Sequence, residues 1–251
     1  MIRSTRRFST LPAAFGVLAL VAISNLACEQ VDSEDVLTSG VYANITAEAD
    51  GDGSTTVSTS LRVGGALSNT FLELGAEESV TATSGGETKT LARRNVLGAI
   101  SYVGTFTGDE TDKAFTVAWN RGEGYESAPN TTLSLPAGFE ITAPAAGATF
   151  SRANDDIVLT WDSSGTTDDM LWEIVTSTCA REMKSNTITG DPGTLTIAAG
   201  TLTNIDGHEG ETCDTTLVLL RRRLGNLDPA YGEGGWVVGR HVRTVTFSSA
   251  P

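Results

Sequence analysis

Acidic side chains that alternate with small residues over 48–53 form the clearest candidate for cation binding. Glu48, Asp50 and Asp52 are spaced two residues apart, and a glycine follows each aspartate. Carboxylate oxygens at this spacing, with glycine for the tight bend, match the start of a calcium-binding loop. The twelfth position, which needs a bidentate glutamate, is Thr59. The segment is predicted to form a hairpin tip, with a weak calcium site as the alternative and no other cofactor.

Other side chains with catalytic potential lack the partners that catalysis needs. His208-Glu209 begins like the zinc-binding helix of a metalloprotease, but Thr212 stands where the second histidine belongs. The carboxylate pair Asp168-Asp169 lies at a predicted strand end, where turn formation is its ordinary role. The sequence contains neither a G-x-S-x-G nucleophile motif nor a phosphate-binding glycine loop. The chain is therefore predicted not to be an enzyme.

A basic cluster and two aromatic residues near the C-terminal end form the candidate binding surface. The cluster follows an apolar strand segment, and strand alternation places Arg221 and Arg223 on one face and Arg222 on the other. Tyr231 and Trp236 flank a glycine-rich loop, and loops of this kind often carry recognition surfaces. We predict Arg221, Arg223, Tyr231 and Trp236 as possible binding residues. Charge pairing at a sheet edge and closure of the core are the alternatives.

The N-terminal segment has the pattern of an export signal. Arg3, Arg6 and Arg7 precede an apolar run over 11–26, and the first acidic residue is Glu29. The run is shorter than the roughly 20 apolar residues of a membrane-spanning helix, and it ends at small residues. Residues 1–27 are therefore predicted to be a signal peptide.

The end of this segment, Asn25-Leu26-Ala27-Cys28, resembles the lipobox of bacterial lipoproteins. The resemblance implies that Cys28 carries a lipid, such as palmitate, and becomes the mature N-terminus. It also implies a location in the bacterial cell envelope, at the outer membrane or cell surface. Asn25 departs from the family pattern, which usually has leucine or another aliphatic residue there. The alternative is ordinary cleavage near Ala27, which would give a soluble periplasmic or secreted protein.

The two remaining cysteines are predicted to form a structural disulfide. With Cys28 assigned to lipid, Cys179 and Cys213 are an even pair in an exported chain, where disulfides persist. A thiol pair for metal or redox chemistry would need closer spacing or nearby histidines.

Charge and composition narrow the classes of partner. The chain of 251 residues has 17 basic and 31 acidic side chains, a formal net charge of −14. It would repel a phosphate backbone, which excludes nucleic acid as the default partner. Charged residues make up only 19% and hydrophobic residues 39%, so the chain is predicted to fold.

The elements that must position these residues are strands. Apolar and polar residues alternate over 41–46 and 57–63, and Asp-Gly steps between them mark a hairpin turn. Further short strands are predicted at 71–74, 80–83, 88–91, 99–106, 115–119 and 132–135. Short strands separated by regular turn signals predict an all-β fold of two tandem antiparallel β-sandwich domains.

The predicted domains meet at a Pro/Ala/Gly-rich segment near residue 144. Residues 28–38 are acidic and are predicted to be a solvated tether, followed by domains at 39–140 and 141–251. The second domain is predicted to contain strands at 148–152, 157–161, 171–178, 186–189, 195–198, 215–223 and 236–247. Its opening segments, 141–147 and 157–161, are similar to the first two strands of immunoglobulin-like and fibronectin type III-like modules. The resemblance implies that Trp161 lies in the core.

Together these patterns predict a non-catalytic, lipid-anchored envelope protein that acts as a binding, adhesion or scaffold module. Its expected partners are the membrane, through the lipid, and an unknown protein or polysaccharide. The alternative function is an exported enzyme or a carbohydrate-active accessory module. An enzyme needs residues that converge in a cleft between the domains, whereas a binding module needs an exposed aromatic or apolar patch.

Overall fold

The computed structural model describes residues 28–185 and 187–251. The predicted signal peptide, Asn25 of the lipobox and Asn186 of one predicted strand lie outside these residues. The described chain is all-β, as the sequence predicts, and its only helical segments are the 3-10 turns η1 (Ser33–Asp35) and η2 (Thr38–Gly40). Among the described residues, no helix is both long and apolar enough to cross a membrane.

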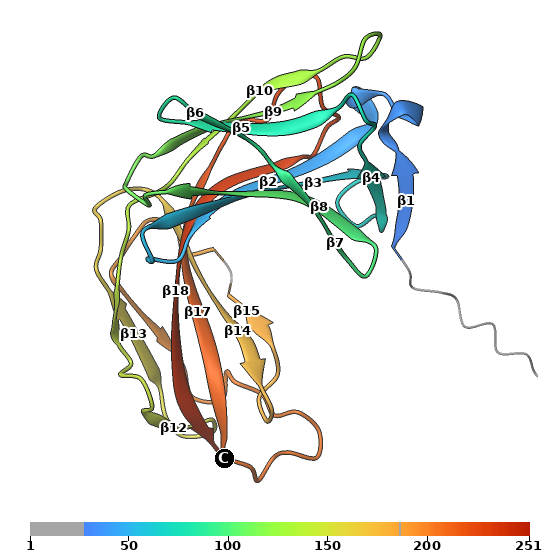
Figure 1. Ribbon diagram of the computed structural model, residues 1–251. Coiled ribbons are helices and arrows are strands. Elements are labelled where there is room, and N and C mark those ends of the chain that lie inside the picture. Colours follow the sequence, from blue (N-terminus) through green and yellow to red (C-terminus); the bar gives the residue numbers. More distant parts are fainter. Residues whose placement is uncertain (1–27, 186) are drawn as a thin grey trace, which may run out of the picture.

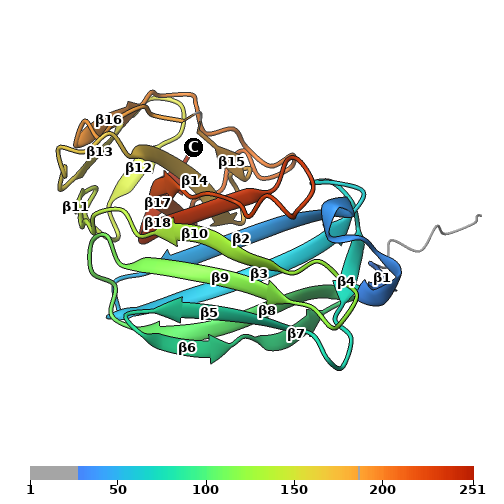
Figure 2. The ribbon, with the colours of Figure 1, turned by 90° about the horizontal axis from the view of Figure 1, so that it is seen from above.

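An N-terminal sandwich is built from two sheets that pack face to face (Figures 1 and 2). One sheet contains β1 (Glu29–Asp32), β2 (Val41–Ala49), β3 (Ser54–Val63), β4 (Thr70–Glu73), β7 (Ala92–Val96) and β8 (Ala99–Thr107). The other contains β5 (Ser79–Ser84), β6 (Glu87–Thr90), β9 (Ala114–Asn120) and β10 (Ala128–Ser134). Alternate residues of β2, from Val41 to Ala49, are fully buried between the sheets. The alternation that predicts this strand therefore also identifies its core face.

A C-terminal sandwich has its own apolar core. A three-stranded sheet of β11 (Ile141–Ala143), β13 (Ile157–Trp161) and β16 (Thr194–Ile197) forms one side. The other side consists of β12 (Thr149–Ser151), β14 (Asp169–Ser177), β15 (Met183–Lys184), β17 (Cys213–Leu224) and β18 (Trp236–Ala250). Trp161 is 4% exposed and packs in this core, as the resemblance implies.

The β17–β18 hairpin belongs to both sandwiches, which differs from the predicted division at residue 140. β17 pairs with β18 along its whole length, and Figure 1 shows the two strands running from one sandwich into the other. The first part of β18, Trp236–His241, pairs in parallel with β2, so the sheet is continuous between the sandwiches. Tyr231 and Val237 accordingly pack in the N-terminal core. Local sequence patterns cannot reveal a parallel pairing between the start and the end of a chain.

The segment predicted to be a solvated tether is folded onto the N-terminal sandwich. β1 pairs in parallel with β4, and the Glu29 N–H donates to the Asn69 carbonyl oxygen at 3.0 Å. The buried Arg121 guanidinium donates to the carbonyl oxygens of Ser33 and Val36, at 2.5 and 2.9 Å. The acidic composition does not reveal that this segment is folded, because the backbone groups that hold it in place are present in every residue.

Candidate functional site

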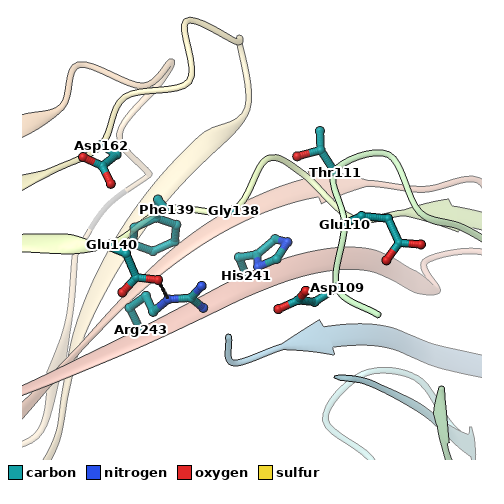
Figure 3. Close-up of a pocket in the computed structure, with 9 residues that line it drawn as sticks. All are labelled: Asp109, Glu110, Thr111, Gly138, Phe139, Glu140, Asp162, His241 and Arg243. Atoms are coloured by element: carbon teal, nitrogen blue, oxygen red, sulfur yellow. Dashed lines mark hydrogen bonds and ion pairs between the residues drawn. The ribbon is translucent and has the colours of Figure 1, made fainter. Parts of the chain in front are cut away.

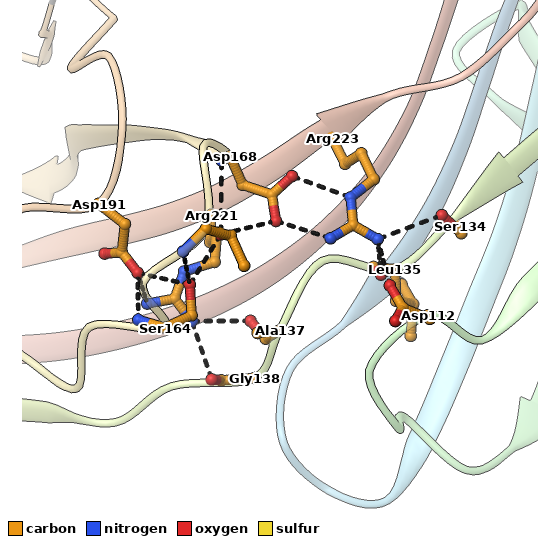
Figure 4. A network of polar contacts seen from close by, with 11 residues as sticks. Asp112, Ser134, Leu135, Ala137, Gly138, Ser164, Asp168, Asp191, Arg221 and Arg223 are labelled. Atoms are coloured by element: carbon orange, nitrogen blue, oxygen red, sulfur yellow. Dashed lines mark hydrogen bonds and ion pairs between the residues drawn. The ribbon is translucent and has the colours of Figure 1, made fainter.

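Arg221, predicted as a surface residue, is instead at the centre of a buried polar network between the sandwiches (Figure 4). Its guanidinium donates to the carbonyl oxygens of Ala137 and Gly138, at 2.8 and 2.9 Å, in the linker between β10 and β11. It also pairs with the Asp191 carboxylate at 2.7 Å, and both side chains are fully buried. Arg221 occupies an inward-facing position of β17, so strand alternation explains its burial and ligand binding is not needed to explain it.

Asp191 is held ionised by the groups around it. Burial raises its pKa, but hydrogen bonds from Ser164, from the Trp161 indole N–H and from Arg221 outweigh burial and lower the pKa below its usual value. A charged carboxylate therefore neutralises the buried guanidinium.

Arg223, two residues along the same strand face, joins the two sandwiches. It forms a two-pronged ion pair with Asp168, at 2.9 and 2.8 Å, and a second pair with Asp112 at 2.5 Å. Hydrogen bonds from Arg223 to Asp168 are the largest cause of a raised pKa for the guanidinium. Because Asp112 precedes β9 and Asp168 precedes β14, the side chain acts as a bridge between domains and is not free to bind a ligand.

Tyr231 is also buried and is not part of a binding surface. Its ring stacks on Trp119 with centroids 6.0 Å apart, and burial raises the pKa of its hydroxyl. The tyrosine therefore closes the N-terminal core, which is the alternative that the sequence left open.

Trp236 is partly exposed and lies over a hollow on the outer face of the β17–β18 hairpin. The hollow has a volume of about 270 Å³. Its floor is apolar, and the Arg222 guanidinium lies 5.4 Å from the centroid of the indole. Arg240, opposite Arg222 in the strand register, lines the hollow and pairs with Glu48 at 2.5 Å. The hollow is lined by Leu171, Glu173, Leu220, Arg222, Trp236, Val238 and Arg240.

The acidic turn forms the β2–β3 hairpin tip and does not gather its carboxylates around one point. The Asp52 carboxylate accepts hydrogen bonds from the Ser54 hydroxyl and N–H, at 2.7 and 2.8 Å, and these bonds lower its pKa. Glu48 is drawn away to Arg240 across the sheet. Within residues 28–185 and 187–251, no three His, Cys, Asp or Glu side chains are placed to hold a metal ion.

A second hollow, of about 390 Å³, opens at the domain junction around His241 (Figure 3). The His241 side chain is buried, and neither ring nitrogen has a hydrogen-bond partner in the described chain. Arg243 beside it pairs with Glu140 at 2.9 Å. Four acidic residues line the hollow together with these groups, namely Asp109, Glu110, Glu140 and Asp162.

The environment of His241 predicts a loss of stability on acidification. Burial is the largest cause of its lowered pKa, the charges of Arg243 and Arg221 add to it, and Asp109 partly opposes it. The unfolded chain therefore binds more protons than the folded chain below pH about 6.5, so the free energy of unfolding falls as the pH falls through this range. The free energy of unfolding, measured with urea from pH 7.5 to 5.0, should depend less on pH in H241Q than in the unaltered protein. The other histidine, His208, supplies the matched control, and an equal change in H208Q would contradict this assignment.

The chain has a structural similarity to a known protein but no match in sequence comparisons. No protein-family model matches the sequence, and no curated protein matches it. Among solved structures, the chain is similar to a segment of two fibronectin type III domains from chicken tenascin, with 10% identity and a TM-score of 0.25. The similarity covers 84% of this chain and 99% of the tenascin segment. The strand pairing itself defines the all-β fold.

The Cys179–Cys213 disulfide is present, as predicted, with a Sγ–Sγ distance of 2.03 Å. Cys213 begins β17, and Cys179 follows β14, its sheet neighbour. The buried Arg152 guanidinium lies against the bridge, 3.1 Å from the Cys179 sulfur. Cys28 is the free cysteine of the described residues.

Sequence reasoning missed Arg222, Arg240 and His241. Strand parity gives a signal for two of them, because His241 shares the inward face of β18 with Val237 and Val245, whereas Arg240 shares the outward face with Trp236. An ionisable residue at an inward position of a long apolar strand indicates a place where two packed units of the fold meet.

Proposed function

We propose that the protein is a lipid-anchored, non-catalytic module of the bacterial cell envelope that binds a polysaccharide through the Trp236 hollow. The observation that carries this proposal is an exposed indole beside an apolar floor and two guanidinium groups. The lipobox-like sequence that ends at Cys28 supports the anchoring.

The chemistry of the hollow fits a sugar chain. The C–H face of a sugar ring packs on an indole, and Trp236 offers 37% of its surface to solvent. Arg222 and Arg240 place N–H donors at the same hollow, where they can reach hydroxyl or carboxylate oxygens of a sugar. Because both guanidinium groups are held by carboxylates, Asp169 and Glu48, the donors are already oriented before a ligand arrives.

The hollow around His241 is less suited to the alternative, an exported enzyme. Glu140 is committed to Arg243, and Glu110 pairs with Lys113 at 2.9 Å. His241 makes no hydrogen bond with a carboxylate or a hydroxyl group of the described residues. Acid–base catalysis needs a proton donor and acceptor positioned against each other, and His241 has no such hydrogen bond with the carboxylates that line the hollow.

Replacing Trp236 with alanine should weaken polysaccharide binding at least about tenfold, because the sugar loses its apolar platform. Binding can be measured by co-sedimentation with insoluble bacterial peptidoglycan and by intrinsic fluorescence with soluble envelope polysaccharides. The matched control is Leu224→Ala, which removes another exposed apolar side chain that does not line the hollow. Equal binding by W236A and the unaltered protein would contradict the proposed site.

A further inference from the structure

Two exposed apolar hairpin tips lie near Cys28. Leu67 and Leu97 are the most exposed large apolar side chains of the described residues, at 97% and 93%, and Val96 is 69% exposed. Leu67 is two residues from Asn69, whose carbonyl oxygen accepts the Glu29 N–H. Leu97 precedes Gly98, where an added Cβ would lie 3.0 Å from the Cys28 Cβ. The first described residue therefore lies close to the bases of both turns.

Figures 1 and 2 agree with this placement. In both views the turn between β7 and β8 lies at the same end of the N-terminal sandwich as β1. The side-chain amide of Gln30 on β1 also donates to the Gly98 carbonyl oxygen, at 3.4 Å. Two neighbouring residues, Cys28 and Gln30, therefore contact the β7–β8 turn at Gly98.

The turn at Leu97 is poorly explained by folding alone. Leu97 and Gly98 form a two-residue turn between paired Val96 and Ala99, and both have positive φ, 52° and 89°. Such turns favour asparagine or glycine, because a branched side chain is strained in the left-handed region. Leu97 is both strained and exposed to water. Contact of its side chain with an apolar environment outside the folded chain would explain why leucine occupies this position.

The charge around the tips differs from that of the whole chain. β7 carries adjacent Arg93 and Arg94, whereas the net charge of the chain is −14. Arg93 pairs with Glu73, and Arg94 is exposed with no ion-pair partner in the described chain. Arg62, at the base of the Leu67 loop, donates to the Ala66 carbonyl oxygen at 2.9 Å. The strands that carry the tips therefore have three guanidinium groups, against the carboxylates of Glu29, Asp32 and Glu73 on β1 and β4.

We propose that Leu67, Arg94, Val96 and Leu97 form a membrane-docking surface that rests on the lipid bilayer beside Cys28. The leucines insert at the boundary between headgroups and acyl chains, and Arg94 faces anionic headgroups. This inference rests on the proposed lipid anchor, because the backbone pairing of β1 begins one residue after Cys28 and leaves no spacer between the anchor and the sandwich. The bilayer is the occupant because the lipobox-like segment ends at Cys28, and a lipid on this cysteine would enter the membrane beside the tips.

Tryptophan quenching tests the contact directly. The full chain is produced in a bacterial host, extracted from the membrane fraction and reconstituted in phosphatidylethanolamine–phosphatidylglycerol vesicles that contain dibrominated phosphatidylcholine. Variants L67W and L97W should each show an added fluorescence component that bromine quenches at least about threefold more than the component added by V158W. Val158 is the matched control because it is exposed on β13 of the other sandwich. Equal quenching in all three variants would overturn the docking surface.

Intact mass separates this inference from the proposed anchor. An acylated protein without quenching at positions 67 and 97 would refute the docking surface and leave the anchor standing. Quenching in a protein without acyl groups would support docking and refute the anchor. A further variant, Leu97→Asn, should raise the midpoint of thermal unfolding in detergent, because asparagine suits the left-handed turn. A lower midpoint would show that folding itself requires the leucine and would remove the main argument for docking.

Discussion

Replacing Asp191 with alanine is expected to lower the free energy of unfolding by about 3–5 kcal/mol, because a buried guanidinium then loses its counter-charge. Arg221 and Asp191 are both fully buried, and Asp191 also accepts hydrogen bonds from Trp161 and Ser164. Urea unfolding at pH 7 measures the change. We expect the largest loss at this position because removal of the carboxylate leaves several buried donors unsatisfied at once.

An exposed ion pair provides the control for D191A. Asp206 pairs with Arg181 at 2.5 Å but is 93% exposed, so D206A should cost less than about 1 kcal/mol. The double variant R221M/D191L should lose less than the sum of the single variants, because no charge is left buried alone. A loss below about 1 kcal/mol for D191A would contradict a structural role for the network, since breaking a buried pair costs several times more.

Removing the disulfide should cost about 3–4 kcal/mol through the entropy of the unfolded chain. The bridge closes a loop with a sequence separation of 34 between Cys179 and Cys213. The segment between them contains β16 and Asp191, so its loosening would also affect the Arg221 network. Chemical unfolding of C179A/C213A, with the unaltered protein under reducing conditions as the matched comparison, measures this contribution. Equal stability of the oxidised protein and the double variant would show that the bridge is not structural.

The strands could be predicted from sequence because their signals are local. Alternating burial in β2 and the Asp-Gly turn after it are encoded within about ten residues, and β13 coincides with the predicted strand 157–161. β7 was missed because all five of its residues are exposed, so the strand has no apolar face to reveal. β1 was missed for a similar reason, since its hydrogen bonds to β4 come from the backbone.

The candidate site was harder to predict because burial depends on the whole fold. Arg221 and Tyr231 have residue types common in binding surfaces, but the parallel pairing of β18 with β2 covers this region with the N-terminal sandwich. Trp236, at the first position of β18, also pairs with β2, opposite Asn44, but its side chain lies on the outward face and stays partly exposed. Residues far apart in sequence decide these outcomes, and a single sequence gives no measure of such contacts.

The most direct test of the account is the intact mass of the protein extracted from its native membrane fraction, before and after reduction and alkylation. We expect a chain that begins at an acylated Cys28, with Cys179 and Cys213 alkylated only after reduction. A chain without acyl groups at Cys28, whether it starts near residue 28 or keeps the N-terminal segment, would contradict lipid anchoring.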